Sequence, residues 1–270
     1  MPISVDLTQL SGYSSLTAGT TYSITAVAQG TGDYTSSNKS AASSYQMPQS
    51  MPVKGDIINI DMTGSGIPQQ YRVLKINGNI AELFSMSDAT SIEFDSGKQN
   101  TYEGKTLDTY LNTTWYNTLS ATAKSAIVDK TFMQDSWYNG PNGYPGYLGK
   151  DKDNSSYRVR RTNASYGNFI KRHVYAMGIQ DISDYLGVTP QMTFSNTTLT
   201  CNNLWTMFWN STTTHSGHIW LRSAYNYNST GTSWAYTVGG YYGNLEEYSA
   251  GASYAARPAF QIDLSKIEWN

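Results

Sequence analysis

Two short hydrophobic pieces that enclose a polar, tyrosine-rich stretch constrain this chain more than any other feature of its sequence. The first piece is Ile-Trp-Leu-Arg-Ser at 219–223, and the second is Ala-Arg-Pro-Ala-Phe-Gln-Ile at 256–262. Seven of the 22 tyrosines fall within 223–254, and Gly, Ser, Thr, Asn and Ala fill most of the remaining positions there. The pattern predicts a rigid frame around a solvated insert whose loops are already ordered before they meet a partner.

The composition of 223–254 favours molecular recognition. Tyrosine provides a large amphipathic contact area at low entropic cost, and small polar residues provide adaptable hydrogen bonds, as in antibody recognition loops. The alternative is that tyrosine-rich β loops simply edge the core. Within this segment we expect Trp234, Tyr236 and Val238, which share strand parity, to point inward.

Charge and apolar content exclude several classes of protein. The chain has 18 basic and 20 acidic residues and a net charge of −2, which does not support electrostatic binding of nucleic acid. No stretch approaches 18 apolar residues, so we predict no membrane insertion. Cys201 is the only cysteine, which excludes an intrachain disulfide and a cysteine-based zinc cluster.

Two prolines near 47–52 predict a boundary between a small β segment, 1–48, and a larger domain, 53–270. In the small segment we expect a strand at 22–28 and a returning strand at 38–45. Leu16 and Tyr22 have the spacing of the tyrosine corner in immunoglobulin-like and fibronectin-type sandwiches, although the match covers only half a sandwich. Half of a sandwich needs a second chain, or further strands of the same chain, to cover its exposed face and its unpaired edges.

The larger domain reads as α+β, with strands first, then helices, then strands again. We expect strands at 55–60, 70–75 and 79–84, with a hairpin at Asn77-Gly78. Leu107, Leu111, Trp115 and Leu119 predict one helical face, and Ser120 is expected to cap a second helix over 121–128. A third short helix fits 181–186 and ends at Gly187.

Motifs for metal binding or catalysis are weak. His215 and His218 are three residues apart in a non-helical stretch without a third ligand, so we favour a chance pair over a metal site. The loop at 151–155 begins like a calcium loop but lacks the glycine and glutamate that follow in such loops, and a polar surface loop is the alternative. We expect no metal, no cofactor and no catalytic residues.

Trp-Leu-Arg-Ser at 220–223, the Asn/Ser/Tyr-rich stretch and Ala-Arg-Pro-Ala-Phe at 256–260 together resemble the variable proteins of diversity-generating retroelements. The resemblance covers about 53–270 and implies a C-type lectin fold with a binding segment at about 223–254. It implies that six positions form an invariant frame: Trp220, Leu221, Arg222, Arg257, Pro258 and Phe260. We expect Arg257 in particular to be buried and hydrogen-bonded rather than displayed.

The resemblance also implies a set of ligand-binding positions. The positions that match the diversified stretch are Tyr225, Asn226, Tyr227, Asn228, Ser229, Thr230, Thr232, Tyr241, Tyr242, Asn244, Glu246 and Tyr248. Glu246 cannot be reached from an asparagine codon by adenine changes, so it is either fixed or outside that pattern. We expect the tyrosines of this set to lie largely on one exposed face.

The function that the resemblance implies is non-enzymatic receptor binding at the tip of a phage or prophage tail fibre, on the virion. The partner would be a host cell-surface protein or glycan, and copies of the chain would form a homo-oligomer, with a trimer favoured. A bacterial surface adhesin is the alternative of the same class. A glycan-processing enzyme on the same fold is the alternative of another class, but 223–254 offers only Glu246 and Glu247 as acids.

Overall fold

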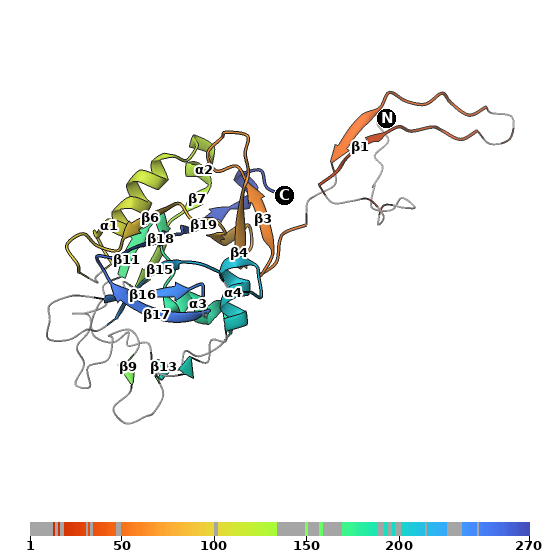
Figure 1. Ribbon diagram of the computed structural model, residues 1–270. Helices are drawn as coiled ribbons and strands as arrows, with labels where there is room; N and C mark the ends of the chain where they lie inside the picture. The colour runs from red at the N-terminus through yellow and green to blue at the C-terminus, as the bar shows by residue number, and fades with distance from the viewer. Residues whose placement is uncertain are drawn as a thin grey trace. The chain divides into compact units, whose positions relative to one another are not determined.

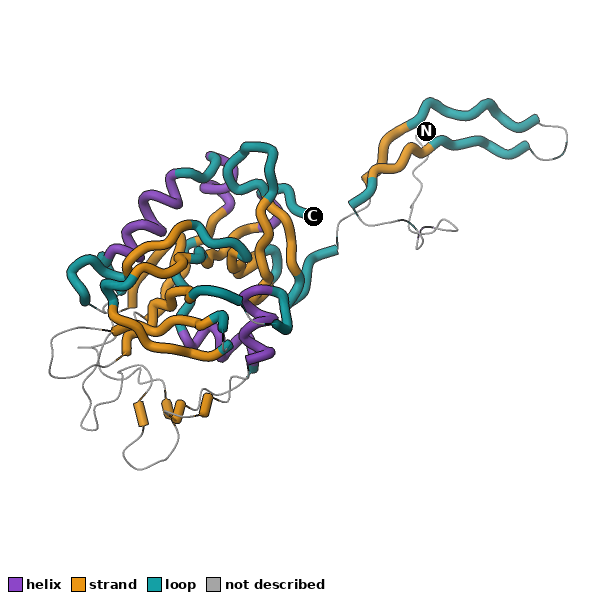
Figure 2. Tube along the Cα trace, viewed as in Figure 1, coloured by secondary structure: helices purple, strands orange, loops and turns teal. Residues whose placement is uncertain are grey.

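Two compact units make up the chain, Met1–Met51 and Pro52–Trp269. The computed structural model describes residues 13, 16, 19–30, 32, 35–46, 50–99, 102–133, 149–150, 157–158, 169–187, 192–193, 196–197, 201–213, 215–225, 234–241 and 243–270 (Figures 1 and 2). The two units are described separately below.

In the first unit, β1 (Thr21–Ile24) pairs antiparallel with β2 (Ser43–Gln46). Both strands are shorter than the sequence predicts, because serine hydroxyls take the place of strand carbonyls beyond Ile24. The backbone N–H of Ala26 donates to Ser40 Oγ at 3.0 Å, and that of Ala28 donates to Ser37 Oγ at 2.9 Å. These side-chain bonds, together with backbone bonds from Ser40 N to Ala26 O at 2.8 Å and from Ser37 N to Ala28 O at 2.9 Å, hold the two arms of the ribbon together without a regular β ladder.

The first sheet of the second unit is built mainly from the residues that follow the boundary. Its strands lie in the order β12–β19–β5–β4–β3, and β7 also pairs with β19. The bounds of these strands are β3 (Ile57–Ile60), β4 (Gln69–Asn77), β5 (Ile80–Ser85), β7 (Ile127–Val128), β12 (Val174–Tyr175) and β19 (Ala259–Asp263). The expected hairpin is confirmed: Asn77 pairs with Ile80, and Gly78 takes a positive φ of 58° in the turn.

The second sheet carries the tyrosine-rich segment. Its strand order is β17–β16–β15–β18–β6, and β15 and β18 run parallel. The bounds are β6 (Thr90–Glu93), β15 (His218–Tyr225), β16 (Trp234–Gly239), β17 (Asn244–Ser249) and β18 (Ser253–Ala256). Short pairs add β8 (Lys130–Met133) with β11 (Phe169–Arg172), β9 (Gly149–Lys150) with β10 (Tyr157–Arg158), and β13 (Met192–Thr193) with β14 (Asn196–Thr197).

The helical segments are short. They are α1 (Thr106–Thr109), the π-helical η3 (Tyr110–Trp115), α2 (Ala121–Ala126), α3 (Ile179–Leu186), α4 (Cys201–Trp209) and the 3₁₀ turn η4 (Leu264–Lys266). In the view of Figure 1, α2 lies above the strands, and α4 lies beside β16 and below β4. Among the described residues, no helix has the length and apolarity needed to span a membrane.

The expected helical face is present at Leu107, Leu111 and Trp115, but its middle is π-helical and Leu119 lies in the turn after the helix. A spacing of four residues drifts around an ideal α-helix of 3.6 residues per turn, and the wider π turn reduces that drift. Leu107 and Leu111 are fully buried as a result. The side chain of Asn112 uses this geometry to bind the backbone of β12: its Nδ2 donates to Val174 O at 2.8 Å, and Val174 N donates to its Oδ1 at 3.2 Å.

The helix ends follow their local sequence signals. The Ser120 hydroxyl accepts from Ala123 N at 3.1 Å, which confirms the expected cap of α2. That helix is shorter than expected, since residues 127–128 form β7 instead. Gly187 takes a φ of 69° after α3, as expected for a helix stop.

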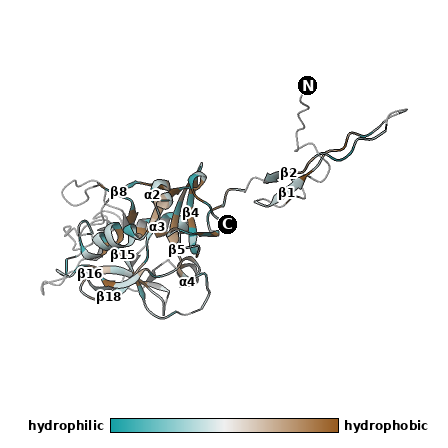
Figure 3. Ribbon diagram, turned by 90° about the horizontal axis from the view of Figure 1, so that it is seen from above, coloured by the Kyte–Doolittle hydropathy of each residue, from teal (hydrophilic) through white to brown (hydrophobic). Residues whose placement is uncertain are grey.

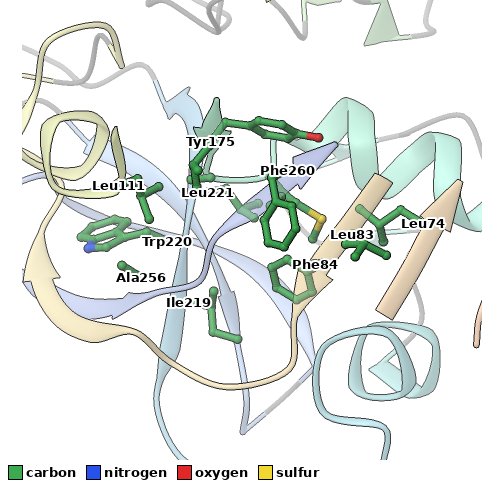
Figure 4. Close-up of a cluster of buried hydrophobic side chains, with 14 of the residues drawn as sticks. Leu74, Leu83, Phe84, Leu111, Tyr175, Ile219, Trp220, Leu221, Ala256 and Phe260 are labelled. Atoms are coloured by element: carbon green, nitrogen blue, oxygen red, sulfur yellow. The ribbon is translucent and has the colours of Figure 1, made fainter. Parts of the chain in front are cut away.

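One core joins the two sheets of the second unit. Figure 4 shows side chains of one buried cluster that come from both sheets, with Phe84 and Phe260 from the first sheet, Ile219 from the second, and Trp220 beside Leu111 and Ala256. Strands such as β4 and β5 carry hydrophobic and hydrophilic residues in mixture (Figure 3), yet four consecutive residues of β4 and five of the six residues of β5 are buried. The second unit is therefore a mixed fold of short helices and antiparallel-rich sheets, consistent with the α+β class predicted from the sequence.

Candidate binding site

The two hydrophobic pieces form strands that adjoin the described strands of the tyrosine-rich segment. The first lies within β15, the second runs from the end of β18 into β19, and Ile219 pairs with Ala255. All six positions that the resemblance assigns to the frame are buried: Trp220, Leu221, Arg222, Arg257, Pro258 and Phe260. The pieces therefore supply the buried strands to which the polar segment is connected.

Trp220 fastens three neighbouring strands of the second sheet. Its Nε1 donates to Ile92 O at 2.8 Å, so the side chain reaches past β18 to β6. Its ring meets Phe94 edge-to-face with a centroid distance of 5.6 Å, and Tyr254 in the same way at 5.2 Å. The indole N–H is thus satisfied within a buried aromatic cluster.

Arg222 carries a buried charge into the core. Its guanidinium forms an ion pair with Asp181 of α3, and Nη1 also donates to Ala176 O at 2.8 Å. The guanidinium carbon lies 4.4 Å from the ring centroid of Phe132 on β8. The side chain of Arg222 therefore connects β15 to α3 and to β8.

Lys130 extends this ion pair into a network. Its Nζ lies 3.1 Å from Asp181 Oδ1 and 2.6 Å from Glu82 Oε1, and the Tyr175 hydroxyl donates to the same Glu82 oxygen at 2.7 Å. Two acids and two bases with bonded partners can remain ionised in a buried setting. Because each charged group of the network already has a bonded partner, we assign it to the scaffold.

The structure confirms the expectation that Arg257 is held in place. The side chain is 5% exposed, its Nε lies 2.5 Å from Asp88 Oδ1, and its Nη1 donates to the carbonyl of Phe208. The guanidinium carbon also lies 5.6 Å from the ring centroid of Trp209. Arg257 therefore fastens the end of α4 to the chain before β6.

The turn between β16 and β17 presents Tyr241 on a fixed backbone. The carbonyl of Gly240 accepts from Trp205 Nε1 at 2.6 Å and from His215 N at 3.0 Å. A Cβ on Gly240 would lie 2.7 Å from the His215 carbonyl oxygen, so this close approach requires glycine. The Tyr241 side chain is 63% exposed, which makes it a large aromatic group projecting from a rigid turn.

Glu246 and Tyr248 share one face of β17, and their side chains pack against residues of other strands of the second sheet. Tyr248 Oη donates to Glu246 Oε2 at 3.1 Å, and the Glu246 carboxylate rests where a Cβ on Gly239 would be, 2.5 Å from its Oε1. His218 lies against both Tyr248 and Tyr254, with ring centroids 4.6 Å and 4.7 Å away. We call His218, Glu246, Tyr248 and Tyr254 the aromatic cluster.

Protonation in the aromatic cluster fits its hydrogen bonding. Burial raises the pKa of Tyr248 to about 12, and the nearby Glu246 carboxylate adds to that rise. Burial likewise raises the pKa of Tyr254, again with a contribution from Glu246. Both phenols therefore stay protonated at neutral pH, so that Tyr248 can donate to the carboxylate.

The predicted ligand-binding positions are only partly described. Tyr241 is exposed, whereas Glu246 and Tyr248 are half-buried, and the backbones of Tyr225 and Asn244 end β15 and begin β17. The remaining predicted positions lie outside the described residues: Asn226, Tyr227, Asn228, Ser229, Thr230, Thr232 and Tyr242. The described members thus place one projecting tyrosine and one packed cluster on neighbouring strands.

The expected alternation along β16 is wrong in one respect. Tyr236 and Val238 are buried as expected, and Trp234 is half-buried, but Ala235 and Thr237 are fully buried too. Both faces of the strand are therefore covered, while its two edges pair with β15 and β17. No residue of β16 is fully exposed, so display falls to residues beyond the strand, such as Tyr241 in the turn that follows it.

The two histidines of the 215–218 stretch do not converge on a metal. His215 stacks on Trp209 with a centroid distance of 5.2 Å, while His218 belongs to the aromatic cluster. Within the part of the chain that the structure describes, no group of three or more His, Cys, Asp or Glu side chains could hold a metal ion. The loop at 151–155 lies outside the described residues.

Sequence reasoning missed α4, which supplies Trp205 and Trp209. The helix lies in a run rich in Thr, Asn and Ser, which reads as a loop. A signal was present: Leu204, Met207 and Phe208 have helical spacing, and all three are fully buried. Asp88 was missed as well, and no local pattern marks it, because its partner Arg257 is 169 residues away.

The fold and the site define a class: a mixed α and β domain that holds an aromatic, hydroxyl-rich segment on a buried frame. Residues 80–264 match the family model described as a domain of unknown function, DUF6273, and the chain belongs to that family. This match runs from β5 to η4 and so includes both hydrophobic pieces and the segment between them. No curated protein and no solved structure matches the chain.

Proposed function

We propose that this chain is a non-enzymatic receptor-binding protein with a C-type lectin fold, of the kind diversified by retroelements and displayed at a phage or prophage tail-fibre tip. Its partner would be a protein or glycan on the surface of a host cell. The observation that carries the proposal is the exposed Tyr241 on a turn whose backbone is tied to Trp205 and His215. An aromatic anchor on an ordered turn contacts a partner without a further ordering cost.

The frame supports the same proposal. Trp220, Arg222 and Arg257 are each buried and bonded to a different part of the second unit, so sequence changes between the two hydrophobic pieces leave those bonds intact. A fold that tolerates variation in one segment is what a receptor-binding protein needs when its target changes. A bacterial surface adhesin would use the same surface from a different location.

Replacing Tyr241 with alanine is expected to weaken attachment to host cells by roughly 10- to 100-fold, since truncating an aromatic hot spot costs about 2 kcal/mol or more. Fluorescently labelled protein and a panel of bacterial strains give the readout by flow cytometry. Ile67→Ala is the matched control, because Ile67 is 68% exposed and lies outside the tyrosine-rich segment. Equal attachment by both variants and the unaltered chain contradicts the role of Tyr241.

The glycan-processing alternative makes a different prediction for the same strains. Cell-surface glycans incubated with a binding protein keep their mass, whereas an enzyme releases sugar that chromatography detects. Release of sugar that depends on Glu246 would favour the enzyme.

We further propose that copies of the chain assemble through the first unit, most simply as a trimer. Within the described part of that unit, β1 and β2 pair only with each other, and an isolated two-stranded ribbon has little stability of its own. Light scattering is expected to give about three times the 29.9 kDa mass of the chain. A monomer at micromolar concentration whose first 50 residues resist protease would show that the ribbon needs no partner.

A further inference from the structure

A pocket of about 250 Å³ lies where three separate parts of the second unit meet. It is lined by the start of β15, by β18, by the end of α4, and by residues 88 and 91. The walls include Asp88, Ser91, Trp209, Ser216, His218 and Ser253. Most of these residues lie outside the tyrosine-rich segment, so the pocket belongs mainly to the rest of the second unit.

The acidic group of this pocket is fixed and its charge is balanced. Arg257 binds Asp88 Oδ1, while the Asp88 side chain remains 51% exposed and so can accept further hydrogen bonds from a ligand. The same arginine lies against Trp209, whose ring stacks on His215 with an interplanar angle of 7°. The carboxylate and the indole are therefore held in place before any ligand arrives.

Serine hydroxyls supply the other polar contacts. Ser91, Ser216 and Ser253 are exposed, and among the described residues their hydroxyls have no hydrogen-bond partner. His218 also lines the pocket, but its Nδ1 is buried and lies 3.5 Å from Glu246 Oε2, which is not part of the lining. A hydroxyl group can donate or accept, so the three serines suit ligand hydroxyls that do both.

We propose that this pocket binds a single neutral saccharide ring of a cell-surface glycan. This proposal rests on the proposed receptor-binding function and specifies the chemistry of the receptor. The ligand class follows from three properties of the site. A volume of about 250 Å³ is below the roughly 300–1,000 Å³ of drug-sized pockets and suits one ring. The balanced Asp88–Arg257 pair favours a neutral ligand over an ion, and the serines match a ligand with several hydroxyls.

A bacterial glycan array tests the proposal first, followed by NMR titration of the full chain with the free monosaccharide that terminates each bound glycan. At least one monosaccharide is expected to bind, and Asp88→Asn is expected to weaken it at least tenfold while Arg257 keeps a partner. Ser91→Leu fills the pocket and is expected to abolish binding. Ser125→Leu, an exposed serine on α2 changed in the same way, is the control and is expected to bind normally.

The outcomes separate this proposal from the receptor-binding function. No signal on the array, or equal binding by Ser91→Leu and the unaltered chain, overturns the saccharide pocket. If Ser91→Leu still attaches to cells and Tyr241→Ala does not, receptor binding stands and the pocket proposal fails. If monosaccharides bind but no strain is recognised, the pocket stands and the receptor-binding proposal fails.

Discussion

Replacing Asp181 with asparagine is expected to lower the free energy of unfolding by about 3–5 kcal/mol, because it leaves the buried guanidinium of Arg222 and the ammonium of Lys130 without their shared anion. For a unit of this size the thermal midpoint should fall by roughly 6–20 °C. Differential scanning calorimetry measures this directly. Lys171→Ala is the matched control, since the Lys171–Asp129 pair spans 2.7 Å but the lysine side chain is 66% exposed, and its loss should cost less than about 1 kcal/mol.

The same substitution should change the acid response. Burial alone would raise the pKa of Asp181, but the charges of Arg222 and Lys130 outweigh it and hold the pKa well below its ordinary value. A depressed carboxyl pKa stabilises the fold above the unfolded pKa of about 3.9, and this stability is lost as the pH falls further. The unaltered chain should therefore lose stability steeply below about pH 4, and Asp181→Asn should lose less over the same interval. Identical slopes would show that Asp181 does not titrate in this way.

Replacing Arg257 is expected to have the second large effect on the stability of the fold. Arg257→Ala is expected to cost about 2–4 kcal/mol, because it removes a bond to Asp88, leaves the Phe208 carbonyl without its donor and opens space beside Trp209. Chemical denaturation of the single variants and of the double variant with Asp88→Ala gives the coupling energy between Arg257 and Asp88, which separates that bond from the rest of the loss. Asp88→Ala alone should cost less, since that side chain is half exposed. An unchanged midpoint together with lost cell attachment would make Arg257 a contact residue instead.

Local signals explain which parts of this fold were predictable. The hairpin at Gly78, the cap at Ser120 and the stop at Gly187 each depend on a few neighbouring residues, and all three are present. The burial of Trp220 and Phe260 followed from their hydrophobic context and from the family resemblance. The π turn at 110–115 was not predicted, since its spacing of four residues is also compatible with a simple helix.

Contacts between distant segments explain what could not be predicted. Trp209, His215 and Arg257 form one stack, and His218 meets Tyr248 and Tyr254, but nothing in the local sequence pairs them. The buried ion-pair network around Lys130 could not be predicted either, because Glu82, Lys130 and Asp181 come from three separate elements. The half-buried state of Tyr248 depends on the same long-range packing, so exposure could not be inferred from composition alone.

The central claim is that tyrosines of the segment between the two hydrophobic pieces bind a cell surface and contribute little to stability. The most direct measurement changes Tyr225, Tyr227, Tyr241 and Tyr242 together to serine and records cell attachment and the thermal midpoint of the same preparation. The comparison is a variant with Val53 and Ile67, which are 64% and 68% exposed, changed to serine. The account predicts that the tyrosine variant loses attachment, that the comparison variant keeps it, and that the midpoint of each stays within about 4 °C of the unaltered chain. Attachment that survives loss of all four tyrosines would contradict it.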